Sequence, residues 1–194
     1  VSEVLDLLDV TALRSRFGLA EADLPTLQRW IEGAGIRWGL DQERLSARGL
    51  PGGLDNNSWR FGLRRMLLGY ASGNTAAWGT IEPYDEIGGL DAALIGPLDQ
   101  LLQAFDRHEQ ALGEPAVPTV WGERLRALLA EFFLAATETD QVLLGQLHES
   151  LDQWLELCDD VQLDEALPLN VVAEAWLSSV GESQLSQRFL AGAV

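Results

Sequence analysis

The segment 56–65, NNSWRFGLRR, is the strongest candidate for an interaction surface in this 194-residue sequence. A helix over residues 58–70 would gather Arg60, Arg64 and Arg65 beside Trp59, with Arg60 and Arg64 four residues apart on one face. Guanidinium groups form paired hydrogen bonds with phosphates and with protein carboxylates alike. Three interpretations therefore stay open for this cluster: ion pairs within the chain, a protein partner, or DNA.

The two histidines do not predict a metal site. His108 shares an apolar stripe with Phe105 and Leu112, so we expect it in the core or at its boundary. His148 lies beside the stripe of its own helix, and we expect it half-exposed at the surface. Because no third ligand stands at a suitable spacing, zinc is not expected.

The other reactive groups do not form a catalytic pattern either. Acidic side chains cluster at 159–165 without a glycine-centred calcium loop, which favours a solvated acidic rim over a metal site. The single cysteine, Cys158, is expected in the core. No Gly-x-Ser-x-Gly motif occurs, and the absence of lysine removes phosphate-binding loops and Schiff-base chemistry of the usual kind. We expect no catalytic residue, no cofactor and no bound metal.

Charge divides the chain unevenly, with 30 acids against 13 bases and a net charge of −17. Residues 1–70 hold nine acids and nine arginines, whereas residues 71–194 hold the other 21 acids and four arginines. The later part therefore repels phosphates and anionic lipid. Any basic surface belongs to the first third, and no apolar run approaches the roughly 20 residues needed to cross a membrane.

Apolar residues recur mostly at helical spacing, and no alternating strand pattern occurs. The sequence predicts short helices in residues 1–70, an irregular but packed connection at 71–89, and longer helices over 90–181. Asp9 is the expected cap of the helix that ends at Gly18, and Pro25 fits a first helical turn. The expected helices lie near 9–17, 24–33, 41–48, 58–70, 94–112, 121–132, 144–158 and 170–180.

These patterns predict an all-α, irregular multi-helix bundle forming one domain over residues 1–194. The sequence begins without methionine and ends on an apolar stretch. We therefore expect it to be a segment excised from a longer protein. Whether such a segment self-associates stays open.

Several blocks resemble RecC proteins, in the same order and at compatible spacings. The resemblance runs from end to end, and blocks in this order are specific. They are SEVLDLLDV (2–10), RFG (16–18), IRWGL (36–40), NSWRFGL (57–63), LLGY (67–70), PYDE (83–86) and RFLAGAV (188–194).

The resemblance implies a cytoplasmic protein, the gamma subunit of exodeoxyribonuclease V (RecBCD), with RecB and RecD as partners. Such a complex acts in double-strand break repair and homologous recombination, and it contacts DNA and recognises the Chi sequence. The segment would resemble the helical 2B domain of superfamily I helicases. No family residue that reads Chi matches a position here, so Trp59, Arg60, Arg64 and Arg65 remain the only candidate partner or DNA interface.

Overall fold

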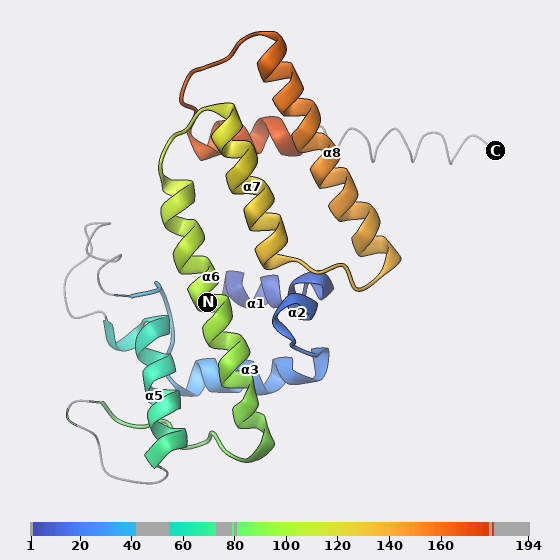
Figure 1. The fold of residues 1–194 in the computed structure, drawn as a ribbon. Helices are drawn as coiled ribbons and strands as arrows, with labels where there is room; N and C mark the ends of the chain where they lie inside the picture. Colours follow the sequence, from blue (N-terminus) through green and yellow to red (C-terminus); the bar gives the residue numbers. More distant parts are fainter. Residues whose placement is uncertain (1, 42–54, 73–78, 80, 179, 181–194) are drawn as a thin grey trace. The chain divides into compact units, whose positions relative to one another are not determined.

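The computed structural model describes residues 2–41, 55–72, 79, 81–178 and 180 (Figure 1). Every named element among them is an α-helix or a short 3-10 helix, and an isolated antiparallel bridge pairs Ala116 with Leu167. The expected all-α class is confirmed. None of the described helices is long and apolar enough to cross a bilayer. The chain divides into two compact units, residues 1–106 and 107–194.

The first unit begins with helices α1 (Ser2–Leu8) and α2 (Thr11–Phe17). Gly18 ends α2 in the left-handed conformation, with φ of 68°, as its position predicted. The expected cap at Asp9 is wrong: Val10 occupies the N-cap without a side-chain hydrogen bond. Because α1 extends to Leu8, Asp9 belongs to the turn after it, and its amide donates to Asp6.

Helix α3 (Leu24–Gly33) follows the 3-10 turn η1 (Glu21–Asp23) and has Pro25 in its first turn, as expected. Proline fits there because the first amides of a helix have no partner within it. Leu27, Trp30 and Ile31 are fully buried. The helix expected at 41–48 lies outside the described residues except for Asp41.

Helix α5 (Trp59–Ser72) follows η2 (Asp55–Asn57) and starts at a serine cap. The Oγ atom of the fully buried Ser58 accepts a hydrogen bond from the amide of Phe61 at 3.2 Å. Trp59, Leu63 and Met66 are buried on one face. Tyr70, expected on that face, is 59% exposed in the last turns of the helix.

The chain after α5 packs closely on it. The amide of Tyr84 donates to the carbonyl of Arg65 at 3.0 Å, and the Tyr84 side chain is buried. A Cβ atom on Gly69 would lie 1.7 Å from the carbonyl oxygen of Tyr84, and one on Gly33 would lie 2.6 Å from its ring. The expected packing of this connection is therefore observed at Tyr84 and Ile87, whereas Trp78 lies outside the described residues.

Helix α6 (Ile95–Gly113) follows η3 (Gly89–Leu94), and its residues up to 106 belong to the first unit. Pro97 lies in the first turn, so it removes no hydrogen bond of the helix. The buried side chains of this part close the core of the first unit, and they are Ile95, Leu98, Leu101, Leu102 and Ala104.

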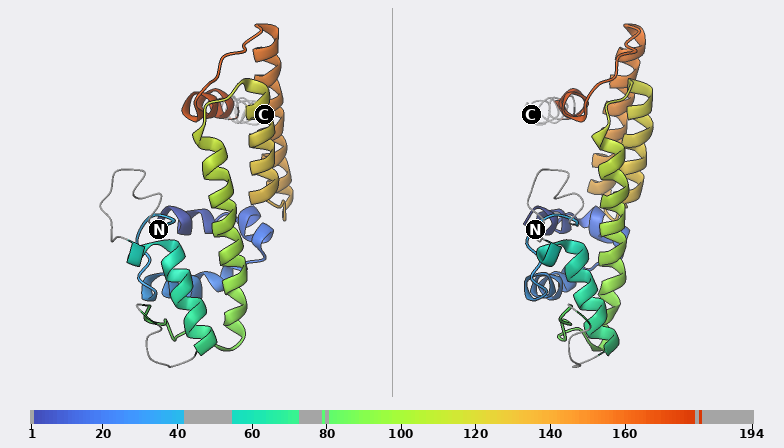
Figure 2. Two further views of the ribbon diagram at one scale, coloured as in Figure 1. Left: turned by 60° about the vertical axis from the view of Figure 1, so that its left-hand side comes forward. Right: turned by 90° about the vertical axis from the view of Figure 1, so that its left-hand side faces the viewer.

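The second unit contains α7 (Pro118–Phe132), α8 (Glu138–Asp160) and helical residues 169–178. Helices α7 and α8 run side by side in both views of Figure 2. Thr137 and Asp140 form a reciprocal capping box at the start of α8. The buried core lies between these helices and contains Trp121, Leu125, Leu129, Leu151, Trp154, Cys158, Val172 and Trp176.

Polar atoms in this core find partners on distant backbone. The Trp121 indole donates to the carbonyl of Leu167 at 2.8 Å, and the Trp176 indole donates to that of Leu147 at 2.9 Å. The hydroxyl of buried Ser150 donates to the carbonyl of Trp176 at 2.6 Å. These bonds fix residues 167–176 against α7 and α8, and they give the indole and hydroxyl groups of this core a backbone acceptor.

The close approach at Gly69 yields a stability prediction. Gly69→Ala should destabilise the first unit by about 1–3 kcal/mol, because the added methyl group meets backbone that must shift. Gly96→Ala is the matched control, since no atom lies within 4 Å of its added Cβ. Urea unfolding followed by tryptophan fluorescence measures both. Equal stability of the two variants would contradict the packing of residues 81–87 on α5.

The second unit is tested at Trp154, which is 9% exposed. Trp154→Ala should cost about 3–5 kcal/mol of unfolding free energy, as truncation of a large core side chain usually does. Leu157→Ala on the same helix should cost far less, because Leu157 is 65% exposed. A loss below about 1 kcal/mol for Trp154→Ala in urea unfolding would show that the wrong face of α8 has been assigned to the core.

Candidate functional site

The three arginines of α5 point to different surroundings. The helix begins at Trp59, which is itself buried in the core of the first unit and is therefore not exposed to a partner. Arg60 and Arg64 are exposed, and Arg65 is half-buried. The sequence placed the three residues on one helix correctly, but their side chains differ in their contacts: Arg60 forms ion pairs and Arg65 bonds to backbone carbonyls.

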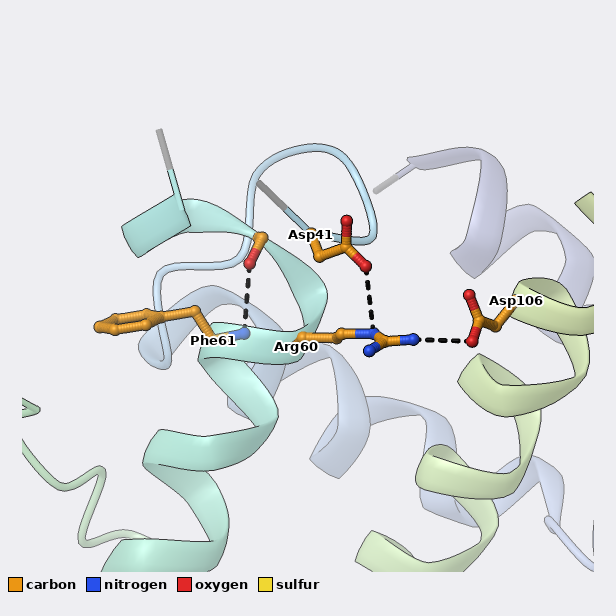
Figure 3. A network of polar contacts seen from close by, with 5 residues as sticks. Asp41, Arg60, Phe61 and Asp106 are labelled. Carbon is orange, nitrogen blue, oxygen red and sulfur yellow. Dashed lines mark hydrogen bonds and ion pairs between the residues drawn. The ribbon is translucent and has the colours of Figure 1, made fainter. Parts of the chain in front are cut away.

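Arg60 is committed to two carboxylates of its own unit. Its Nη2 atom lies 2.7 Å from Oδ2 of Asp106 on α6, and its Nε atom lies 3.3 Å from Oδ2 of Asp41 (Figure 3). The backbone amide of Arg60 also donates to the carbonyl of Leu40 at 3.0 Å. Arg60 therefore connects the first turn of α5 with α6 and with residues 40–41.

The Arg65 side chain donates hydrogen bonds to two backbone carbonyls, one from a segment before α5 in the sequence and one from a segment after it. Its Nη1 atom donates to the carbonyl of the buried Ala34 at 2.8 Å, and its Nε atom donates to the carbonyl of Glu82 at 2.8 Å. Ala34 follows the end of α3, where carbonyl groups lack partners within the helix. Arg65 therefore caps the end of α3 and holds the segment around Glu82 against α5 through a hydrogen bond.

Arg64 differs from its neighbours because no hydrogen bond or ion pair joins its side chain to another of the described residues. It lines an open groove of about 300 Å³ between α5 and α6 within the first unit. Leu63, Leu67 and Leu102 supply the apolar part of the lining. Asp99 and Gln103 stand on the α6 side, where the Gln103 amide donates to Asp99 at 2.7 Å.

His108 lies at the edge of the core, as expected, with its side chain 11% exposed. Its Nε2 atom is 2.7 Å from Oε2 of Glu131, and its ring meets Phe132 edge to face at 5.3 Å between centroids. Arg107 donates to the other oxygen of Glu131. The hydrogen bond from Arg107 lowers the pKa of Glu131, and the bond from His108 lowers it further against the opposing effect of burial.

Sequence reasoning missed this cluster because Glu131 lies 23 residues from His108, on another helix. One usable signal was that His108 falls on the apolar stripe of its helix, where a buried imidazole needs a polar partner. His148 is exposed, and its Nδ1 atom lies 2.7 Å from the carbonyl of Leu144 on its own helix. The two histidines therefore lie in different environments.

Two further side chains with ionisable groups, Cys158 and Tyr84, are buried and contribute to packing. Burial raises the pKa of the Cys158 thiol, so the thiol stays protonated in the core. Burial and a 2.9 Å hydrogen bond to Glu86 raise the pKa of Tyr84 to about 12. Among the described residues, no group of three or more histidine, cysteine, aspartate or glutamate side chains is arranged to hold a metal ion.

Comparison with known proteins identifies relatives along the whole chain. Residues 1–184 match the family model described as the RecBCD enzyme subunit RecC fourth domain. The chain is 36% identical over 198 residues to the RecBCD enzyme subunit RecC of Escherichia coli, which covers 99% of this chain and 17% of that protein. Identity to the Haemophilus influenzae RecC subunit is 31% over 193 residues, covering 99% and 16%.

A mycobacterial relative is similar over a shorter stretch. The RecC subunit of Mycolicibacterium smegmatis is 34% identical over 136 residues, which covers 69% of this chain and 12% of that protein. The chain thus spans about a sixth of the length of the Escherichia coli and Haemophilus relatives, at 17% and 16%.

The different roles of the arginines predict different costs of removal. Arg65→Ala should lower the unfolding free energy by about 1–3 kcal/mol, because it leaves the buried carbonyl of Ala34 without its donor. Arg64→Ala should change it by less than about 0.5 kcal/mol. Urea unfolding of the two variants, matched in size and charge, measures the difference. Equal effects would contradict the assigned contacts.

The Glu131 cluster predicts a pH dependence. A carboxyl whose pKa is lowered by folding adds stability above its unfolded pKa of roughly 4.3, and this stability is lost as pH falls through the lowered folded value. Glu131→Gln should therefore be less stable than wild type at pH 7, with a deficit that shrinks below about pH 4.3. Urea midpoints across pH measure it, with the exposed Glu149→Gln as control. A pH-independent deficit would contradict the ion pairs.

Proposed function

The chain belongs to the RecC family, in which it corresponds to the fourth domain, and from this premise we propose that it is a non-catalytic structural and interaction domain of a RecC subunit. The observation that carries the proposal is the family match over residues 1–184, which spans nearly all of both units. The use of polar side chains supports it further. Arg60, Arg65, Ser150 and the two paired indoles bond to carboxylates or carbonyls of their own unit.

The setting of this domain follows from the same premise. We propose that it works within a RecBCD enzyme, together with RecB and RecD, in double-strand break repair and recombination with recognition of Chi. Its place would be that of the helical 2B domain of superfamily I helicases. In this proposal the complete RecC subunit takes part in these processes, and the present domain contributes a structural element and a contact surface to that subunit.

A second candidate is a DNA-guiding module that uses Arg60, Arg64 and Arg65. It is favoured by one observation, which is the exposed position of Arg64 without an ion pair to any described residue. Two others count against it: Arg60 already faces two carboxylates, and Arg65 bonds to two backbone carbonyls. The 21 acids of residues 71–194 also oppose the approach of phosphate.

Forked DNA and the assembled enzyme distinguish the two candidates. Arg60→Ala with Arg64→Ala, introduced into full-length RecC, should change the DNA affinity of the RecBCD enzyme less than about twofold if the domain is structural. A guiding role instead predicts weaker binding to every sequence and a salt slope reduced by about 2, one for each lost phosphate contact. Fluorescence anisotropy at salt concentrations from about 0.05 to about 0.2 M measures the DNA affinity and its salt dependence.

The chain by itself provides a further test. With its helical content verified by circular dichroism, it should show no ATPase or nuclease activity and no saturable DNA binding at about 0.15 M salt. Submicromolar binding that is lost in the double arginine variant would support the guiding module. Hydrolysis of ATP or DNA by the purified chain would overturn the non-catalytic assignment.

A further inference from the structure

The groove between α5 and α6 is a candidate site for the proposed interaction role. The inference drawn from it rests on that proposed function. We propose that it is the docking site for an amphipathic helix of another protein chain. That helix would present an aliphatic side chain to the groove, an acidic side chain to Arg64, and a hydrogen-bond donor to Asp99. The three features correspond to the three chemically different parts of the groove wall.

The apolar part of the wall favours a protein over a nucleic acid. Leu63 and Leu102 are buried at 7% and 4% exposure, whereas Leu67 is 45% exposed. Covering Leu67 removes apolar surface from water, which stabilises a complex with an aliphatic partner. A phosphate backbone offers nothing comparable. A groove of about 300 Å³ between two helices suits the anchor side chains of a docked helix.

The charges favour a single carboxylate over a polyanion. Arg64 is the lining cation that has no ion pair among the described residues, and Arg60 is held by Asp41 and Asp106. Asp99 adds a third carboxylate close to these two guanidinium groups. Arg64 can form one bidentate pair with a partner carboxylate, because no described carboxylate is paired with it, whereas a run of phosphates would also meet Asp41, Asp99 and Asp106.

The geometry of α5 fixes the order in which charged and apolar side chains follow one another along the groove. Arg60, Arg64 and Leu67 follow one another at intervals of four and three residues, so they lie along one stripe of the helix. The stripe therefore places Arg64, which has no ion pair within the described part of the chain, one turn before the exposed side chain of Leu67. A docked helix matches this order when its acid and its aliphatic residue are also separated by three or four positions.

Photo-crosslinking in the assembled enzyme tests the proposal. Full-length RecC carries benzoylphenylalanine in place of Leu67, or in place of Val10 as a control of similar exposure, since these residues are 45% and 40% exposed. After irradiation of the purified RecBCD enzyme, the crosslinked peptide is mapped by mass spectrometry. We expect position 67 to crosslink to a helical segment of another subunit with an acidic residue within one turn, and position 10 not to crosslink to it.

Charge reversal makes the test specific. Arg64→Glu should lower the crosslinking yield from position 67 by about tenfold, the effect of losing roughly 1.4 kcal/mol of binding. Arg37→Glu, at another exposed arginine of the same unit, should leave it unchanged. Reversal of the mapped acidic residue to arginine should restore the yield with Arg64→Glu.

Three results would overturn the docking site: a crosslink from position 67 to DNA, a crosslink within the same chain, or no crosslink in an enzyme that has assembled. Insensitivity of the yield to Arg64→Glu would overturn the role of the cation as well. Size-exclusion chromatography of the unsubstituted enzyme tests the proposed function separately. If unsubstituted RecC fails to assemble with its partner subunits, the interaction role and the docking site both fail.

Discussion

Buried backbone carbonyls are the constraint on which both units depend. Short helices and irregular connections leave carbonyl groups without helical partners, and burying such a group unpaired costs about 1–3 kcal/mol. This chain solves the problem with long polar side chains that reach across the sequence. Arg14 caps the end of α1 at Leu8, Arg65 reaches Ala34, and the Trp121 indole reaches Leu167. A side chain such as Arg65, which the sequence indicates as a candidate binding residue, therefore stabilises the fold by bonding to backbone carbonyls.

The same use of side chains shapes the electrostatics of the second unit. Arg107 pairs with Glu131 and Arg126 pairs with Asp152, while Arg124 donates to a backbone carbonyl and lies over the ring of Trp121. These are the three arginines that the unit has among its described residues. Because they are held locally, the many remaining carboxylates dominate its outer field. Such a surface discourages nonspecific association with polyanions at physiological salt.

The sequence predicted what depends on local spacing. Apolar periodicity located α3, α5, α6, α7 and α8, and the turn preferences of Gly18 and Pro25 located helix ends, because these effects act within a few residues. The cap at Asp9 failed for a related reason, since the exact end of α1 decides which residue can cap α2. Contacts that join distant segments had no such signal. The pairing of His108 with Glu131 and the carbonyl bonds of Arg65 depend on how helices pack, which periodicity does not specify.

The arginine cluster shows how this difference affects functional inference. From sequence alone, Arg60, Arg64 and Arg65 were equivalent, and an intramolecular role, a protein partner and DNA were all open. Packing makes them unequal, because ion pairs engage Arg60 and backbone carbonyls engage Arg65. Arg64 is the member of this cluster whose side chain has no hydrogen bond or ion pair to the described residues, and it lies beside the exposed Leu67. A charge cluster is therefore a poor guide to a binding site until the contacts of each member are known, and the member with the fewest internal contacts is the one on which recognition would depend.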